Sequence, residues 1–335
     1  MKKSLIALAV LAASGAAMAQ SSVTLYGIAD IWFGRTSFEE TVNGVTTKAP
    51  SQTVLQDGGV SNSRWGLKGS EDLGGGLKAN FKLEQGFNID TGAQAAAGKA
   101  FSREAWVGVS GGFGEVQLGK ANNAFDDVSA LAASAFDSDL AAINNVFVST
   151  AFANAYDNTI KYATPSFGGF SGAVSMSLGE NKGANYSADS IYSISGKYAA
   201  GPLAIGLAYA KEKSEVPGDV YDAKATRLAG SYDLGVAKLL ATYGRVKEGN
   251  DKVTEYEIGA DVPLSPALTL SGGYARSKGK VTGLPDITGK SFGIAVAYSL
   301  SKRTTAYAGL NNTKYDTTGY DSKANIYAVG VKHAF

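Results

Sequence analysis

The chain has 335 residues, of which 44% are hydrophobic and 18% are charged, and its 31 Lys+Arg nearly balance its 30 Asp+Glu. The hydrophobic content argues against a disordered chain, and the balanced charge argues against a basic surface for nucleic acid. Cysteine is absent and histidine occurs once. Thiolate metal sites, disulfides and histidine-based acid–base chemistry therefore have almost no residues to use.

The first nineteen residues contain the three parts of a secretory signal peptide. Lys2 and Lys3 form a basic start, residues 5–17 are uncharged and mostly apolar, and Ala17-Met18-Ala19 matches a small-x-small cleavage site. The apolar run is shorter than the roughly 18 residues that a membrane-spanning helix needs. We therefore expect residues 1–19 to be a cleaved signal peptide and residues 20–335 to form one exported domain.

From residue 23 onward the chain alternates between two faces. In residues 77–84 apolar side chains alternate with polar ones, and residues 23–33, 205–209, 268–274 and 294–298 follow the same period of two. This period predicts strands with one apolar face. The first strand places Val23, Leu25, Gly27, Ala29, Ile31 and Phe33 on one face, and Thr24, Tyr26, Asp30 and Trp32 on the other.

The predicted connections alternate between short and long. Gly, Pro and Asp mark short turns, whereas the longer connections are polar. The count gives sixteen strands with both termini at one rim, which is typical of a transmembrane antiparallel β-barrel with short periplasmic turns and long extracellular loops. A soluble propeller would instead show repeats of roughly 40–50 residues, and none is visible. The long loops are expected at 37–60, 89–99, 121–157, 180–190, 212–224, 247–252, 278–288 and 314–322.

Aromatic residues recur near the expected strand ends and on apolar faces, as they do in the aromatic girdles of such barrels. The last strand, residues 325–335, alternates and ends on Phe335. An aromatic carboxyl terminus resembles the signal by which the outer-membrane assembly machinery recognises its clients. The girdle candidates include Tyr26, Trp32, Phe33, Trp65, Phe87, Trp106, Tyr162, Phe170, Tyr198, Tyr209, Tyr243, Tyr274 and Tyr298.

Several blocks of residues resemble the general porins of betaproteobacteria, of the neisserial type. The blocks are residues 22–27, 63–79, 111–119, 162–170 and 329–335, so the resemblance extends from residue 20 to the end of the chain. Lys120 departs from the family pattern, in which Arg often follows the Leu-Gly pair, so the planar guanidinium is missing there. The resemblance implies a trimeric, sixteen-stranded, water-filled pore with the third long loop folded inside each barrel.

The segment 121–157 is the candidate constriction loop. It is far longer than a hairpin needs and is rich in alanine, which fits packing against an interior wall better than a free external loop. A partly helical cap outside the barrel is the alternative. The loop carries the acidic candidates Asp126, Asp127, Asp137 and Asp139.

Basic residues are expected to face this loop. Trp65, Leu67, Leu77, Phe81 and Leu83 are assigned to the outer face, so the alternation assigns Arg64, Lys68, Lys78, Lys82 and Glu84 to the lumen. A lumen position is favoured physically because Arg or Lys on the lipid face costs about 2–4 kcal/mol at the midplane. Arg103 shares its parity with Ala105 and Val107, so it needs a bulge or a place outside the bilayer to join the lining.

A basic wall opposite an acidic loop predicts an outer-membrane porin for passive diffusion of small hydrophilic solutes and ions, with weak anion preference. The alternative is a substrate-specific channel, which Tyr26 and Trp32 keep open as lumen aromatics. We expect no enzymatic activity, because acid–base partners for a nucleophile are missing, and no cofactor or metal. The expected partners are further copies in a homotrimer, outer-membrane lipid and lipopolysaccharide, permeating solutes, and the assembly machinery through Phe335, but no nucleic acid.

Overall fold

The computed structural model describes residues 22–134, 136–183, 187–216 and 219–335. The predicted signal peptide, residues 1–19, lies outside these residues. Within the described ranges, no helix has the length and apolar character required to cross a membrane.

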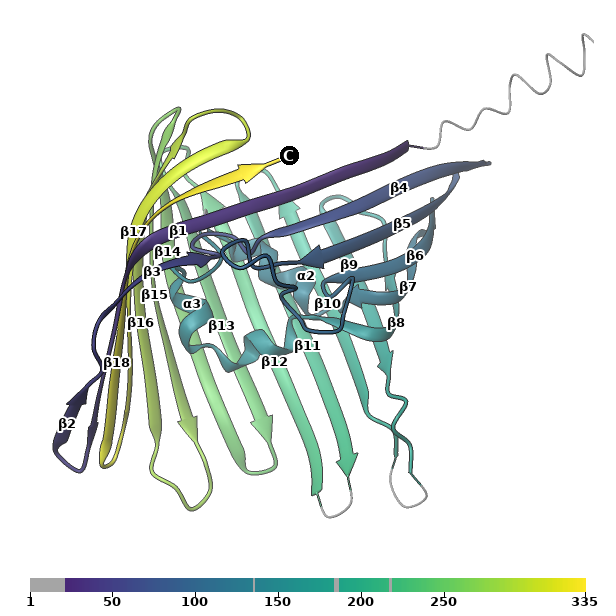
Figure 1. Ribbon diagram of the computed structural model, residues 1–335. Helices are drawn as coiled ribbons and strands as arrows, with labels where there is room; N and C mark the ends of the chain where they lie inside the picture. The colour runs from purple at the N-terminus through teal and green to yellow at the C-terminus, as the bar shows by residue number, and fades with distance from the viewer. Residues whose placement is uncertain (1–21, 135, 184–186, 217–218) are drawn as a thin grey trace, which may run out of the picture.

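One antiparallel sheet contains all the strands of the described residues, and it closes on itself (Figure 1). Closure follows from pairing of the first strand with the last, from Ile28 opposite Ala334 to Val42 opposite Tyr320. The strands are β1 (Ser22–Val42), β2 (Val45–Lys48), β3 (Gln52–Asp57), β4 (Arg64–Gly74), β5 (Leu77–Gly86), β6 (Glu104–Gly111), β7 (Gly114–Asn122), β8 (Ala155–Ala163), β9 (Phe170–Leu178), β10 (Ser190–Ala200), β11 (Leu203–Val216), β12 (Asp219–Asp233), β13 (Lys238–Glu248), β14 (Asp251–Ser265), β15 (Leu268–Lys280), β16 (Ile287–Ser299), β17 (Thr304–Thr317) and β18 (Tyr320–Ala334).

Three of these labels belong to one strand of the wall. Strand β1 pairs with β2 at its outer end, with β3 through residues 31–36, and with β4 through residues 22–28. The segments β2, β3 and β4 therefore follow one another along the same side of β1. Counted as one, they make sixteen wall strands with β1 and β5–β18, which confirms the predicted sixteen-stranded antiparallel barrel.

The second wall strand is interrupted between β3 and β4. Asp57 lies opposite Ile31 and Arg64 lies opposite Ile28. Six residues, 58–63, therefore lie opposite only two residues of β1, 29 and 30. Four of the six have no partner position on β1 and leave the hydrogen-bond ladder. Gly58 has a φ of 78°, a left-handed conformation that favours glycine. We call residues 58–63 the strand break.

The two ends of the barrel differ, as predicted, but the long hairpins contain more strand than expected. Strands β11 and β12 reach Val216 and Asp219, and β17 and β18 reach Thr317 and Tyr320, inside segments predicted as loops. The polar sequence hides these extensions because both faces lie in water beyond the membrane, so alternation stops while backbone pairing continues. The long hairpins lie at the lower end of Figure 1, and the carboxyl terminus lies at the upper end.

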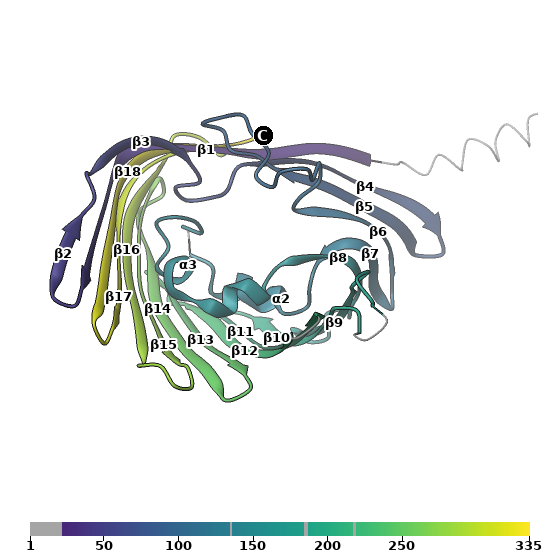
Figure 2. The same ribbon diagram turned by 60° about the horizontal axis from the view of Figure 1, so that its bottom comes forward.

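The segment between β7 and β8 lies inside the ring of strands (Figure 2). It contains α2 (Asp126–Ser129), η1 (Ala130–Ala132), α3 (Ala142–Val146) and η2 (Val148–Phe152). Phe125, Val128 and Phe152 are buried against wall alanines such as Ala208 and Ala225. This placement confirms the inward third loop and excludes the external cap. We call residues 123–154 the inner loop.

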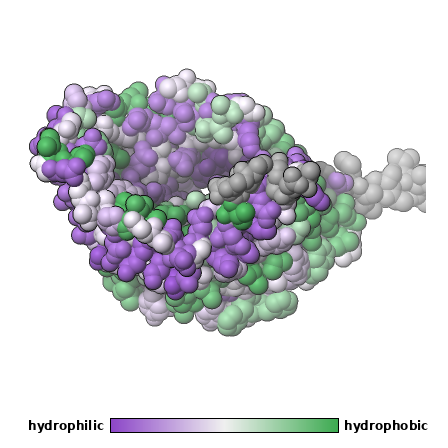
Figure 3. Space-filling model, turned by 90° about the horizontal axis from the view of Figure 1, so that it is seen from below, coloured by the Kyte–Doolittle hydropathy of each residue, from purple (hydrophilic) through white to green (hydrophobic). Residues whose placement is uncertain are grey.

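The outer wall is apolar and the mouth is polar. Val23, Leu25 and Phe33 of β1 are 64%, 59% and 55% exposed, as expected for side chains facing lipid or another subunit. Viewed from the end with the long hairpins, hydrophilic residues surround a hollow, whereas hydrophobic residues gather on the outside (Figure 3).

The girdle prediction is wrong for Tyr26, Trp32 and Trp106, which point into the barrel. Trp32 is 1% exposed and packs beside Phe136 of the inner loop. Tyr26 and Trp106 bond to lumen carboxylates described below. They share the polar parity of their strands, and side-chain size alone did not distinguish an interior aromatic from an interfacial one.

Candidate functional site

A cavity of about 810 Å³ lies between the inner loop and the wall. The inner loop occupies the side of β9–β17, because α2 packs beside β10–β12 and α3 beside β15–β17. The free side is formed by β4–β6 and the segment before β6, through residues such as Asn62, Glu84, Arg103 and Glu104. Charged side chains line the cavity from both sides, with Arg103 and two glutamates on the free side and Arg227 with four acids on the side of the inner loop.

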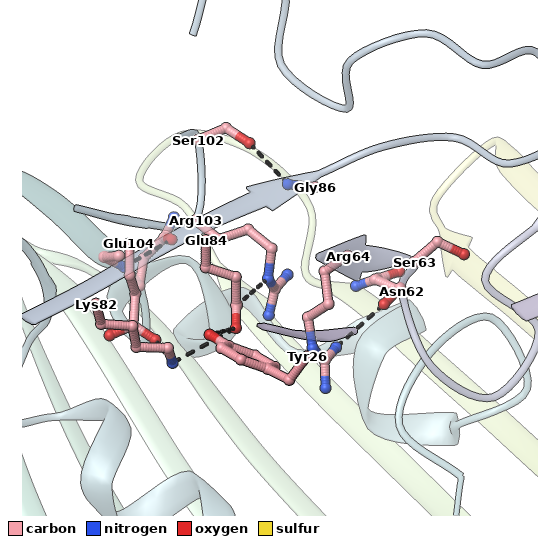
Figure 4. A network of polar contacts seen from close by, with 12 residues as sticks. Tyr26, Asn62, Ser63, Arg64, Lys82, Glu84, Gly86, Ser102, Arg103 and Glu104 are labelled. Carbon is pink, nitrogen blue, oxygen red and sulfur yellow. Dashed lines mark hydrogen bonds and ion pairs between the residues drawn. The ribbon is translucent and has the colours of Figure 1, made fainter. Parts of the chain in front are cut away.

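Five side chains form an ion-paired network on the free side (Figure 4). Arg103 Nε lies 2.7 Å from Glu84 Oε1, and Lys82 Nζ lies 3.5 Å from Glu84 Oε2. Lys82 also pairs with Glu104. The hydroxyl of Tyr26 donates to Glu84 Oε2 at 2.7 Å. Alternation positions these groups, since Lys82 and Glu84 are two residues apart on β5 and Glu104 lies opposite Glu84 on β6.

The cations of this network are more exposed than its carboxylates. The side chains of Arg103 and Lys82 are 37% and 25% exposed, whereas those of Glu84 and Glu104 are 5% and 12% exposed. A buried carboxylate with several donors is satisfied inside the wall. The most exposed charges of the network are therefore its two cations.

The other basic candidates lie at different distances from this network. Arg64 donates to the carbonyl of Asn62 in the strand break, and the Nζ of Lys68 lies 5.1 Å from the ring centroid of Tyr26. Lys78 lies at the short-turn end of β5, opposite Asp72. Four residues of strand, about 13 Å, separate Lys78 from Lys82. Lys78 is thus the basic candidate that the fold does not bring to the network.

Arg103 escapes simple parity because it precedes β6. Its backbone N–H donates to the carbonyl of Glu84 at 3.1 Å, and its side chain turns inward to the same residue. Arg103 thus precedes the strand, where the alternation of β6 no longer fixes the direction of its side chain.

Two acidic candidates lie at the tip of the inner loop, which docks on the strand break by backbone hydrogen bonds. The N–H of Asp137 donates to the carbonyl of Val60 at 3.0 Å, and the N–H of Asp139 donates to the carbonyl of Gly58 at 3.3 Å. The four residues that leave the sheet ladder thus form the docking point of the inner loop. The sequence showed no signal for it.

The other two acidic candidates lie at the start of the inner loop, away from the tip. Asp127 accepts from Lys161 of β8 at 2.7 Å, so its charge is paired. Asp126 lies near Arg227 of β12 and lines the cavity. The four loop acids therefore occupy two places, and only Asp137 lies near Arg64 and Arg103.

Burial changes the protonation of three loop acids. It raises the pKa of Asp139 to about 6, and the charges of Asp57 and Asp30 add to the rise. Burial also raises the pKa of Asp137, against the lowering by a hydrogen bond with Asn144 and by the charge of Arg64. The pKa of Asp126 is raised by burial and then by Asp127. These three carboxyl groups are consequently weaker acids than exposed aspartates.

Sequence reasoning missed the charged residues that hold the inner loop against the wall. Arg227 is 2% exposed and donates to Ser149 of the inner loop at 2.8 Å. Glu255 is fully buried and accepts from the backbone N–H groups of Val148 and Ser149. Glu257 lines the cavity beside them. One signal was available in the sequence. Within residues 225–229, the charged Arg227 has alanine as its neighbour on the same strand face in both directions.

Where charged side chains meet in the described residues, they are arranged as ion pairs. No group of three or more His, Asp or Glu is arranged there to hold a metal ion. His333, at the short-turn rim, contacts Thr304 through Nδ1 at 2.9 Å.

Comparison with known proteins places this geometry in context. A family model described as Gram-negative porin matches residues 5–318. The chain is 36% identical to outer membrane porin protein 32 of Delftia acidovorans and 31% identical to an outer membrane porin protein of Bordetella pertussis, over 100% of both chains in each case. Among solved structures, it is similar to the anion-selective porin from Comamonas acidovorans, with a TM-score of 0.76 and 28% identity over 94% of this chain and 100% of that chain.

Proposed function

Because the chain belongs to the Gram-negative porin family and forms a water-filled channel across the outer membrane, we propose that this channel is weakly anion-selective. The observation that carries the proposal is the difference in exposure within the network on β4–β6. Arg103 lines the cavity and is 37% exposed, and Lys82 is 25% exposed, whereas their partners Glu84 and Glu104 are only 5% and 12% exposed. The similar protein from Comamonas acidovorans is described as anion-selective, which supports the same sign.

The preference is expected to be weak because the cavity lining is mixed. Asp126, Asp137, Asp139 and Glu257 line the side opposite the basic wall. An anion attracted to Arg103 therefore passes loop carboxylates across the cavity. The same arrangement sets up a transverse field, which orders water and disfavours apolar solutes while small hydrophilic ones pass.

Reversal potentials in a salt gradient across a planar bilayer test the sign. We expect a permeability ratio modestly in favour of chloride over potassium. A clear preference for potassium would overturn the proposal, since it would mean that the loop acids dominate the conduction path.

We propose general diffusion and not a substrate-specific channel. Trp32 is 1% exposed beneath the inner loop, so it offers no face to a sugar. Tyr26 is bonded to Glu84 and is covered by Lys68 and Lys82. Swelling of proteoliposomes in graded sugars should show a smooth size cut-off. Saturation of flux by one solute would favour the specific channel.

Assembly forms part of the same proposal. Ala29, Ile31, Val329 and Val331 form a flat apolar outer face on paired β1 and β18, suited to packing in a homotrimer. Arg35 also faces outward on β1, and a charge there is better covered by a second subunit than by lipid. Chemical crosslinking of the native protein tests the stoichiometry, and a monomer under all conditions would contradict it.

Export, assembly and the surroundings of the barrel belong to the same proposal. Residues 1–19 would be removed on export, Phe335 would be read by the assembly machinery, and lipopolysaccharide would surround the outer half of the barrel. Phe335 already closes the barrel, because its N–H and carbonyl exchange hydrogen bonds with Gly27 at 3.0 Å. The family consists of channel proteins, and we propose no catalytic activity, cofactor or nucleic-acid partner for this member.

A further inference from the structure

The connection between β5 and β6 contributes its own side chains to the cavity. It consists of residues 87–103, which we call the wall loop. Ala95, Ala96, Ser102 and Arg103 of the wall loop line the cavity on its free side. The ion-paired network contains only Arg103 of these four. The wall loop thus borders the cavity with two small apolar side chains as well as with a charged one.

The wall loop folds back on the end of β5. The N–H of Ala95 donates to the carbonyl of Gly86 at 3.0 Å, and the N–H of Gly86 donates to Ser102 Oγ at 3.3 Å (Figure 4). Phe87 and Gln94 form an antiparallel β-bridge near the start of the loop. Compact loops whose ends lie close together are frequently functional. The middle and the end of the wall loop are therefore both fixed at Gly86, beside the network.

Gly86 brings Ala95 and Arg103 side by side. A Cβ built at Gly86 would lie 3.1 Å from the Cβ of Ala95 and 3.4 Å from the Cδ of Arg103. Both side chains therefore cover the same glycine, which has no side chain to separate them. Ala95 is exposed, and Arg103 is the most exposed cation of the network. A group attached at Ala95 would thus stand beside this charge in the cavity.

An ion pair ties the wall loop to the strand that follows the inner loop. Lys99 Nζ lies 2.6 Å from Asp157 Oδ2, and Lys120 Nζ lies 3.0 Å from Asp157 Oδ1. Asp157 belongs to β8, which begins directly after the inner loop. The wall loop is therefore anchored at β5 on one side and at β8 on the other. Two anchors keep it in place as a boundary of the cavity.

We propose that the wall loop is a second constriction element, and that Ala95 and Ala96 determine the largest solute that passes between it and the inner loop. The width and the lining groups of a pore decide which solutes it admits. Larger side chains at these two positions would reduce the cavity of about 810 Å³. This inference rests on the proposed general diffusion and adds to it the residues that set the size limit.

Swelling of proteoliposomes in graded sugars measures the size limit. Ala95→Trp places a large side chain in the cavity, so we expect the flux of a trisaccharide relative to a monosaccharide to fall roughly threefold or more. Ala93→Trp is the matched control, because Ala93 is exposed in the same loop and is not among the residues that line the cavity. Its flux ratio should equal that of the wild type. Equal ratios in the two folded variants would overturn the proposal.

Modification of a single cysteine tests the same position without a large substitution. The chain has no cysteine of its own, so Ala95→Cys and Ala93→Cys each provide one thiol. At Ala95→Cys, a thiol reagent that carries a sulfonate should move the reversal potential toward cation preference, and one that carries a trimethylammonium group should move it toward anion preference. The shifts at Ala93→Cys should be much smaller. Equal shifts at the two positions, or no shift at either, would overturn the proposal.

The wild-type protein tests the channel function separately from the wall loop. A smooth decline of flux with sugar size in the wild type supports general diffusion, and saturation by one sugar contradicts it whatever the variants do. A smooth decline that is the same in the wild type, Ala95→Trp and Ala93→Trp would leave general diffusion standing. It would overturn the role of the wall loop, because the size limit would then lie within the inner loop alone.

Discussion

The walls β4–β6 and β15–β18 use the same alternation with opposite charge placement. On β4–β6 the charged side chains point inward, as Lys82, Glu84 and Glu104 do, and the outer face is apolar. On β15–β18 the inward residues are small and polar, such as Ser291 and Asn311, and the charged side chains of Lys290 and Lys314 point outward. The inner loop therefore decides which wall faces the open cavity.

The inner loop covers the lumen face of β15–β17, so charges there would be buried without water. Leu140, near the tip of the inner loop, packs with Ala295 and Tyr307 of that wall. Burial of unpaired charge is costly, and serine, asparagine and glycine avoid that cost. The wall of β4–β6 remains open to the cavity, where charges stay hydrated and act on passing ions.

The largest expected effect comes from breaking the contact between the inner loop and β16. A Cβ at Gly293 would overlap the carbonyl oxygen of Leu140, far inside any real contact. Gly293→Val should therefore push the tip of the inner loop away from the wall and into the cavity. We expect lower single-channel conductance and a loss of about 1–3 kcal/mol in unfolding free energy, measured by denaturant titration.

Gly196 on β10 provides the control, because a Cβ there meets nothing within 4 Å. Gly196→Val should leave conductance near the wild-type value. Normal conductance in folded Gly293→Val would show that the inner loop tolerates displacement from β16. The inner loop would then not determine which of the two walls is open to the cavity.

The next effect inverts charge on the open wall. Lys82→Glu removes the cation that bridges Glu84 and Glu104 and adds a third carboxylate. Unit charges 4 Å apart interact by about 1 kcal/mol in water, and the substitution changes the local charge by two units, which corresponds to up to roughly a 30-fold change in relative permeability before salt screening. We expect the reversal potential to move clearly toward cation preference.

Lys78→Glu is the matched variant on the same strand and face. Lys78 lies at the turn end, away from the network, so the same charge change should shift the reversal potential much less. Equal shifts from the two variants would place the selective region along the whole lumen and not at the network.

Much of this fold was predictable because a strand in a barrel must alternate and must pair. The alternation of residues 77–84 was enough to orient Lys82 and Glu84, and the turn pattern was enough for the strand count. The inner loop was recognisable because alanine-rich residues such as Ala124 and Ala132 need a wall to pack against.

The contacts of the inner loop were not predictable, because they join segments far apart in the chain. The Asp-Gly-Gly sequence at 57–59 marks a turn, but that residues 58–63 leave the ladder within one wall strand becomes visible only from the difference between two registers. Trp32 was a candidate both for the girdle and for the lumen, because burial beneath a loop and burial in lipid favour the same side chain. The pairing of Glu104 with Lys82 needed the register between β5 and β6.

The smallest expected effect is the pH dependence of selectivity, which tests how the inner loop acts on the open wall. The pKa of Asp139 is raised to about 6 by burial, with Asp57 and Asp30 adding to it. Lowering the pH from about 7.5 to about 5 protonates Asp139 and removes one negative charge beside the cavity, so anion preference should rise. The folded state binds this proton more readily than the unfolded chain does. The contribution of Asp139 to stability therefore grows as the pH falls through about 6 and is lost as the pH rises.

Asp139→Asn separates this group from other acids, because it fixes the neutral state at every pH. The variant should show the higher anion preference already at pH values above 6 and should lose most of the change near pH 6, measured as reversal potentials in one salt gradient. An unaltered pH profile in the variant would assign the titration elsewhere, with Asp126 and Asp137 as the next groups to test, since burial raises the pKa of both. In that case the tip of the inner loop would position the constriction through its backbone hydrogen bonds to the strand break, and its charge would have no part in selection.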